Sequence, residues 1–376
     1  MRPHGFGEQP GFGSPALDRL RRLEPLFDPL LAVPPETREA PRSSPWLNVV
    51  LFLATVLTTM AAGAIQSQGE QAFTSLRNFL QGLPFSVALL GILLAHEMGH
   101  YFVSWHHRVP ASLPYFIPVP TFIGTMGAII RMRTVVRDRR ILFDIGIAGP
   151  LAGMCVALPA AVIGLLHSET TSLATAGGGI ELGDSLLFSA LTHLVVGDVP
   201  DGMTVVLHPV AFAGWLGFFV TSLNLLPMGQ LDGGHVTYGI FGPGHGRLSR
   251  MTFLALLAWG VHGAFLNRDP LQWAWAALFL WTGFRIAFSA RQVRGFQRLI
   301  AVVLLAVGIG RNFVPGTLLW VFWAVLMTFL RLDHPPTRDF FVPLDRKRKI
   351  LGWTALLIFL VTFIPKPFVQ IPFHSP

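Results

Sequence analysis

Residues 84–105 read PFSVALLGILLAHEMGHYFVSW, an apolar run that carries two histidines and a glutamate. An apolar run of about 17–25 residues is long enough to cross a bilayer as a helix. Histidines four residues apart, such as His96 and His100, lie on one face of a helix and can reach one ion. Placing these imidazoles and Glu97 near hydrocarbon costs free energy, so such groups are usually functional. The stretch therefore predicts a membrane-spanning helix with a metal site.

The composition of the whole chain agrees with a membrane protein. Of 376 residues, 52% are hydrophobic and 13% are charged, whereas a soluble domain carries about 25% charged residues. This balance excludes an ordinary soluble globule, and the abundant apolar side chains exclude a disordered chain. The single cysteine, Cys155, excludes a disulfide framework and a cysteine-based zinc site.

Further apolar runs frame this helix along the chain. They cover residues 46–65, 142–166, 208–228, 251–266, 271–290, 299–311, 317–330 and 350–364. With the first run they predict an all-α polytopic membrane protein of about nine transmembrane helices. We divide it into a flexible cytoplasmic tail (1–45), a core (46–241) and C-terminal transmembrane helices (242–376).

One stretch of the core does not fit a helix. Residues 109–133 contain four prolines followed by two glycines, and proline favours extended chain over helix. We expect a small β segment associated with the membrane here. Exposed backbone at that depth is tolerated only where protein or water covers it.

The basic residues predict the orientation of the chain. The net charge is +8, arginines cluster between residues 131 and 140, and no Lys or Arg occurs from residue 141 to 246. Lys and Arg are retained in cytoplasmic loops, so we place the loop 167–207 outside and the N-terminus inside. We interpret the charge as orientation and expect no nucleic-acid partner. We also expect no secretory signal peptide, and a multi-pass protein of a bacterial inner membrane.

A catalytic zinc usually takes three protein ligands and leaves a fourth position for water. The stretch NLLPMGQLDGGH, which ends at His235, contains Asp232. Its helix should return to the same face and depth as the two histidines, so Asp232 is the best candidate. Asp144 is a rival, but Arg139 and Arg140 favour a salt bridge there. His235 is a further possible ligand, for which a supporting or interfacial role fits better.

HEMGH and NLLPMGQLDGGH, in this order, closely resemble the motifs of the site-2 protease family, the intramembrane zinc metalloproteases of peptidase family M50. The resemblance implies one zinc ion per chain with three ligands, His96, His100 and Asp232. It also implies Glu97 as the catalytic acid/base and Asn224 in binding the substrate or the transition state.

The resemblance covers residues 87–241, and two features refine it. The loop 167–207 is too short for the PDZ domain that many bacterial members carry, so the chain resembles the PDZ-less branch that includes plant chloroplast members. The sequence from His334 to Thr337, HPPT, also resembles that branch. The proline-rich stretch 109–133 would correspond to the family's membrane-facing sheet.

The predicted function is cleavage of transmembrane segments of membrane proteins, that is, regulated intramembrane proteolysis. The partners are transmembrane protein substrates and membrane lipid, and the oligomeric state is left open. One alternative is a metal transporter that uses the same ligands and tolerates loss of Glu97. Another is a membrane di-iron oxygenase, which needs several histidine boxes, whereas no second paired-histidine box follows His107.

Overall fold

A computed structural model describes residues 45–134, 136, 138–172, 180–266, 269–288, 291–311, 313, 317–330, 332–334, 337 and 343–370. All of them belong to one compact unit, Ser44–Pro376. Residues 1–44 of the predicted tail lie outside the described residues, as do Arg137 of the basic loop and the two prolines of HPPT.

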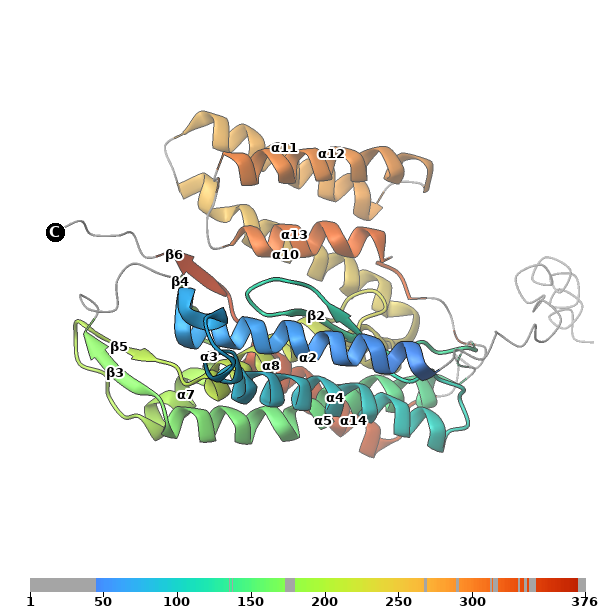
Figure 1. Cartoon of the computed structure of the whole chain (residues 1–376). Helices are drawn as coiled ribbons and strands as arrows, with labels where there is room; N and C mark the ends of the chain where they lie inside the picture. The colour runs from blue at the N-terminus through green and yellow to red at the C-terminus, as the bar shows by residue number, and fades with distance from the viewer. Residues whose placement is uncertain are drawn as a thin grey trace, which may run out of the picture. The chain divides into compact units, whose positions relative to one another are not determined.

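The described chain is mostly helical (Figure 1). Its α-helices are α2 (Pro45–Gln68), α3 (Leu76–Leu80), α4 (Leu83–His106), α5 (Arg139–Leu166), α7 (Leu186–Val195), α8 (Pro209–Asn224), α9 (Asp232–Phe241), α10 (His245–Leu266), α11 (Pro270–Phe288), α12 (Arg291–Gly310), α13 (Leu318–Phe329) and α14 (Arg346–Thr362). Two 3-10 helices, η1 (Gly69–Phe73) and η2 (Gly242–Gly244), and six short strands complete it.

Three helices form the centre of the structure: α4 and α8 both pack along α5, and α4 also contacts α8. Their shared core contains large side chains from α4 and α8 and small ones from α5. The fully buried members include Phe85, Leu89, Ala157, Ala161, Trp215 and Phe218. Small residues let helix backbones approach closely. Such close packing holds helices together inside a membrane, where the hydrophobic effect does not drive their association. The centre therefore holds α4, which carries HEMGH, against two rigid neighbours.

A helix occurs at every predicted apolar run, and these helices differ in length and in hydropathy. Among the described residues, three segments are long and apolar enough to cross a membrane: Pro45–Phe73, Leu76–His106 and Arg139–Leu166. Helices α7, α8 and α13 are apolar but shorter. Nine transmembrane helices thus stays a prediction.

The predicted β segment is confirmed as a hairpin. Strands β1 (Tyr115–Pro118) and β2 (Thr125–Ile129) pair in antiparallel fashion, with Phe116 opposite Ala128. β1 contacts α2 and β2 contacts α4. The proline-rich stretch therefore places extended backbone beside the helix that carries the two histidines.

Two other sheets involve the loop 167–207. β3 (Glu169–Ser172) pairs with β5 (Met203–Val206) inside this loop. β4 (Ile180–Leu182) instead pairs with β6 (Phe368–Gln370), far along the chain. This second pairing ties the segment after α14 to the loop that follows α5.

The polypeptide after α8 does not continue as a helix to Met228, as the apolar run suggested. α8 ends at Asn224, and a loop leads to α9 at Asp232. Pro227 cannot donate a helical hydrogen bond, and Gly229 adopts a φ of 57°, which favours glycine over residues with a Cβ. These two residues therefore end the helix before Asp232.

The C-terminal end of α4 and the N-terminal ends of α5 and α14 meet at Asp144. Its carboxylate accepts two hydrogen bonds from Arg348, both at 2.7 Å, and one from His107 at 3.0 Å. The prediction of a salt bridge at Asp144 is right in kind, but its partners come from distant segments. The expected partners donate to carbonyls: Arg139 to Gly239 and Ile240 of α9, and Arg140 to Pro343.

Candidate metal centre

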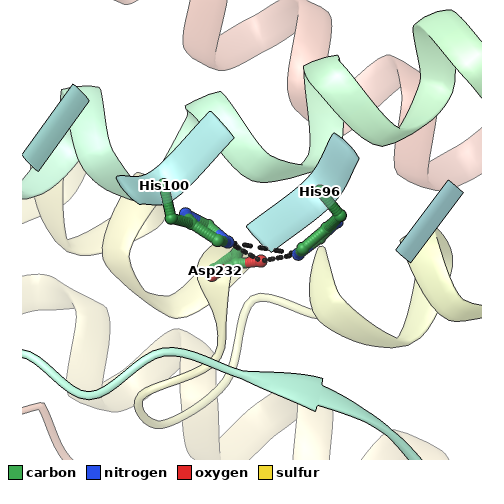
Figure 2. Close-up of side chains that lie close together, drawn as sticks. All are labelled: His96, His100 and Asp232. Carbon is green, nitrogen blue, oxygen red and sulfur yellow. Dashed lines mark hydrogen bonds and ion pairs between the residues drawn. The ribbon is translucent and has the colours of Figure 1, made fainter. Parts of the chain in front are cut away.

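The two histidines of HEMGH lie one helical turn apart on α4, and both are buried. His96 is 4% exposed and His100 is 7% exposed. Their Nε2 atoms are 3.1 Å apart. Figure 2 shows both rings pointing from α4 toward a third side chain, Asp232. The helical spacing in the sequence therefore produces the convergence of imidazoles that it predicted.

Asp232 reaches these rings from the first residue of α9. Its Oδ2 lies 3.1 Å from His96 Nε2 and 3.2 Å from His100 Nε2. The turn that delivers it needs glycine at position 233, because a Cβ there would lie 2.0 Å from the carbonyl oxygen of Leu225. The Asp-Gly pair thus lets α9 start tightly against the loop that follows α8.

The spacing of the three donor atoms fits a zinc ion. Ligands placed tetrahedrally at about 2.0–2.1 Å from zinc lie about 3.3 Å from one another, close to the observed 3.1–3.2 Å. His96, His100 and Asp232 form the one group of at least three potential ligands of this kind among the described residues. Two neutral imidazoles and one carboxylate are a usual donor set for catalytic zinc.

The orientation of His100 is fixed by its second ring nitrogen. Its Nδ1 donates to the carbonyl of Ile145 on α5 at 2.7 Å, which leaves Nε2 without a proton and directed at the site. A hydrogen bond of this kind commonly sets the tautomer of a metal-binding histidine. Helix α5 makes room for the ring with Gly149, where a Cβ would lie 2.1 Å from His100 Nε2.

Two further predicted residues lie at the same place. Glu97 is 7% exposed, and it lies on the helix α4 that β2 contacts. Asn224, the last residue of α8, donates from Nδ2 to His96 Nε2 at 3.2 Å. The structure therefore brings all five sequence-predicted site residues to one region, from α4, α8 and α9.

The other sequence candidates are bonded to other partners. Asp144 is engaged by Arg348 and His107, and His235 bonds to His334 instead. Sequence reasoning missed the supporting contact at the Ile145 carbonyl, which carries no side-chain signal.

Comparison with known proteins matches residues 84–260 to the sequence profile of peptidase family M50. The matched region contains α4, α5, α8 and α9, and with them every residue of the cluster. This match covers just under half of the chain, so residues 84–260 are similar to peptidase family M50.

Curated proteins that are similar to this chain are named as zinc metalloproteases. A probable chloroplastic zinc metalloprotease, EGY1, of Oryza sativa subsp. japonica is 35% identical over 53% of the chain and 34% of its own length. Its Arabidopsis thaliana counterpart is 34% identical over 50% of the chain and 37% of its own length. EGY2 of Arabidopsis thaliana is 28% identical over 68% of the chain and 45% of its own length.

The chain spans between a third and a half of the length of these relatives. No solved structure matches it. The recognition of the family from HEMGH and NLLPMGQLDGGH is confirmed, whereas the individual roles of the site residues stay predictions.

Proposed function

We propose that this chain is an intramembrane zinc metalloprotease that cleaves transmembrane segments of membrane proteins, the reaction of regulated intramembrane proteolysis. The proposal depends on one observation. His96 and His100, on the apolar helix α4, and Asp232, on α9, have donor atoms within 3.2 Å of one another, and Glu97 lies beside them. We propose one zinc ion per chain, held by these three side chains.

Held by these three side chains, a zinc ion would supply a bound water with a pKa lowered from 15.7 toward about 7 and would polarise a peptide carbonyl. Glu97 would take a proton from the attacking water and deliver it to the leaving amine. Its position one residue after His96 places it on the helix that holds the two imidazoles. A positioned acid/base of this kind contributes about 10²–10⁴-fold to the rate.

Asn224 supplies a donor at the site. Its Nδ2 lies 3.2 Å from His96 Nε2, so the amide hydrogens are next to the atom proposed to bind zinc. With that nitrogen bound to zinc, the amide would be free to donate to the carbonyl oxygen of a substrate. We therefore propose that Asn224 binds the substrate and stabilises the developing oxyanion.

The hairpin β1–β2 supports the way a substrate could be presented. A transmembrane helix must become extended before its peptide carbonyl can be attacked, and an edge strand offers backbone partners to an extended segment. Within the described residues β1 and β2 pair only with each other, and β2 contacts α4, the helix that carries Glu97. We propose that the substrate strand lies along this hairpin.

We also propose an orientation in a bacterial inner membrane with the N-terminus in the cytoplasm. The start of α5 carries Arg139 and Arg140, and the start of α14 carries Arg346 to Lys349; both starts meet at Asp144. Basic residues are retained on the cytoplasmic side. The metal centre, with α9 packed against α5, would then open toward the cytoplasm.

The test compares Glu97→Gln, His96→Ala and the wild type, each expressed together with a single-span membrane substrate. We expect Glu97→Gln to keep its zinc and to lose cleavage by about 10²-fold or more, whereas His96→Ala loses the zinc. Glu169→Gln, at an exposed carboxylate of β3, is the matched control and should cleave normally.

Cleavage by Glu97→Gln at the wild-type rate would remove the acid/base role, and stoichiometric zinc in His96→Ala would show that the ligand set is wrong. Metal uptake into vesicles separates the transporter alternative. A transporter would keep its uptake in Glu97→Gln, while a protease shows no uptake dependent on these ligands.

A further inference from the structure

Four residues between α13 and α14 contact either α9, which carries Asp232, or the next helix, α10. They are Leu332, Asp333, His334 and Thr337, which we call the clamp residues. The ring of His334 shares a hydrogen bond of 2.8 Å with His235 Nδ1 and stacks on Tyr238 with ring centroids 4.5 Å apart. The backbone N–H of Thr337 donates to the hydroxyl of Tyr238 at 3.1 Å.

His235 and Tyr238 are both on α9, three residues apart, and residues at this spacing are neighbours on a helix surface. His235 in turn follows Asp232 by three residues. The clamp residues therefore hold α9 through two adjacent turns, directly after the proposed zinc ligand.

The clamp residues also reach the loop that precedes Asp232. The carbonyl of Leu332 accepts from Ser249 Oγ on α10, and the same Oγ accepts from the backbone N–H of Gly229 at 3.0 Å. Asp333 pairs with Arg250 at 2.9 Å. Ser249 is fully buried, so water does not compete for the two hydrogen bonds of its hydroxyl group. Asp232 is thus held from Gly229 on one side and from His235 on the other.

This arrangement matters because the two kinds of proposed ligand differ in support. His96 and His100 lie in the interior of α4, a helix of 24 residues. Asp232 begins α9, a helix of 10 residues, and helices that short are marginal without tertiary contacts. Zinc ligands must sit within about 0.2 Å of their ideal distance. The carboxylate is therefore the ligand whose position most depends on its surroundings.

We infer that His334 is a positioning residue for the metal centre: through its hydrogen bond to His235 it sets the place of α9 and of the Asp232 carboxylate. This inference rests on the proposed function, since it assumes that His96, His100 and Asp232 bind zinc. The HPPT sequence that begins at His334 thereby acquires a physical role at the site, although it lies 99 residues beyond His235.

Two substitutions separate the hydrogen bond from the packing. His334→Phe keeps an aromatic ring against Tyr238 but cannot bond to His235, whereas His334→Gln retains a polar group that can. We expect His334→Phe to weaken zinc binding about tenfold, in the range seen when outer contacts of metal ligands are lost, and His334→Gln to restore most of it. His193→Phe, at an exposed histidine paired with Asp198, is the control and should bind zinc normally.

The measurements are the zinc dissociation constant of the full-length purified protein, the visible spectrum of its cobalt-substituted form, and its unfolding midpoint. A displaced carboxylate should change the cobalt spectrum of His334→Phe. A lower unfolding midpoint with unchanged zinc affinity and cobalt spectrum would show a merely structural role and overturn the inference. An equal loss in His334→Gln would also overturn it.

Failure of the proposed function is distinguishable from failure of this inference. If wild type binds no zinc, or if His96→Ala binds it as well as wild type, the metal centre itself is wrong. If His96→Ala loses zinc and His334→Phe does not, only the positioning role falls.

Discussion

Replacement of Gly149 by alanine should remove zinc from a protein that still folds. A Cβ at this position would lie 2.1 Å from His100 Nε2, 2.4 Å from Cε1 and 2.5 Å from Cδ2. Ordinary contacts between such atoms begin near 3.5 Å, so the ring has to move by more than about 1 Å. Zinc ligands tolerate displacements of only about 0.2 Å.

The ring of His100 also cannot retreat freely, because its Nδ1 is bonded to Ile145 on the same helix, α5. We therefore expect Gly149→Ala to weaken zinc binding by about 100-fold or more. Loss of a hydrogen-bond partner behind a metal ligand weakens metal affinity by about 10–100-fold, and here the ligand itself is displaced. The assay is zinc per chain after purification, followed by competition with a chelating dye of known affinity.

Two alanine substitutions serve as controls for the steric argument. At Gly153, one turn further along α5, a Cβ would lie 3.3 Å from His96 Cβ and Nδ1, so Gly153→Ala should weaken zinc binding only a few-fold. At Gly91 a Cβ would meet only Val156 Cγ1, at 4.0 Å, so Gly91→Ala should bind zinc like wild type. Wild-type zinc affinity in Gly149→Ala would refute the reasoning about His100.

Two other predictions concern the substrate donor and a helix cap. Asn224→Ala should lower kcat by about 10²–10³-fold with little change in KM, measured on a purified single-span substrate; a loss confined to KM would contradict the oxyanion role. The backbone N–H and then the guanidinium of Arg348 lower the pKa of Asp345, the N-cap of α14. The stability from this cap is present above the ordinary aspartate pKa of about 3.9 and is lost as the pH falls through the lower folded value. The unfolding midpoint of the wild type should thus exceed that of Asp345→Asn at pH 6, and the difference should close in acid; a constant difference would contradict it.

The parts of the site that follow from local periodicity could be predicted from the sequence. The spacing of His96 and His100 fixes their shared face as soon as α4 is a helix. Asp232 required one more step, the return of the chain to the same depth, and the charge pattern supplied it. The break before α9 was predictable because Pro227 and Gly229 have known backbone preferences.

The parts that depend on pairs far apart in the chain could not be predicted. Arg348 bonds to Asp144 across 204 positions, and His334 bonds to His235 across 99. Such pairs leave no periodic signal in the sequence, and Asp144 has basic residues much nearer to it along the chain than Arg348. The nearby Arg139 and Arg140 were the reasonable expectation for Asp144, but they satisfy backbone carbonyls of α9 and of the segment before α14.

Helix α14 is bonded at both ends to segments next to α5, and these two contacts fix its direction relative to α5. Its start is bonded to the start of α5 through Asp144, and the strand after its end pairs with β4, which follows the end of α5. The two helices therefore run in the same direction. In the topology that we predict, α2, α4, α5, α8 and α14 each cross the membrane once, and α8 returns the chain after α5. Helices α10 to α13 would then contribute an even number of crossings, and topology reporters placed in successive loops should yield an odd total.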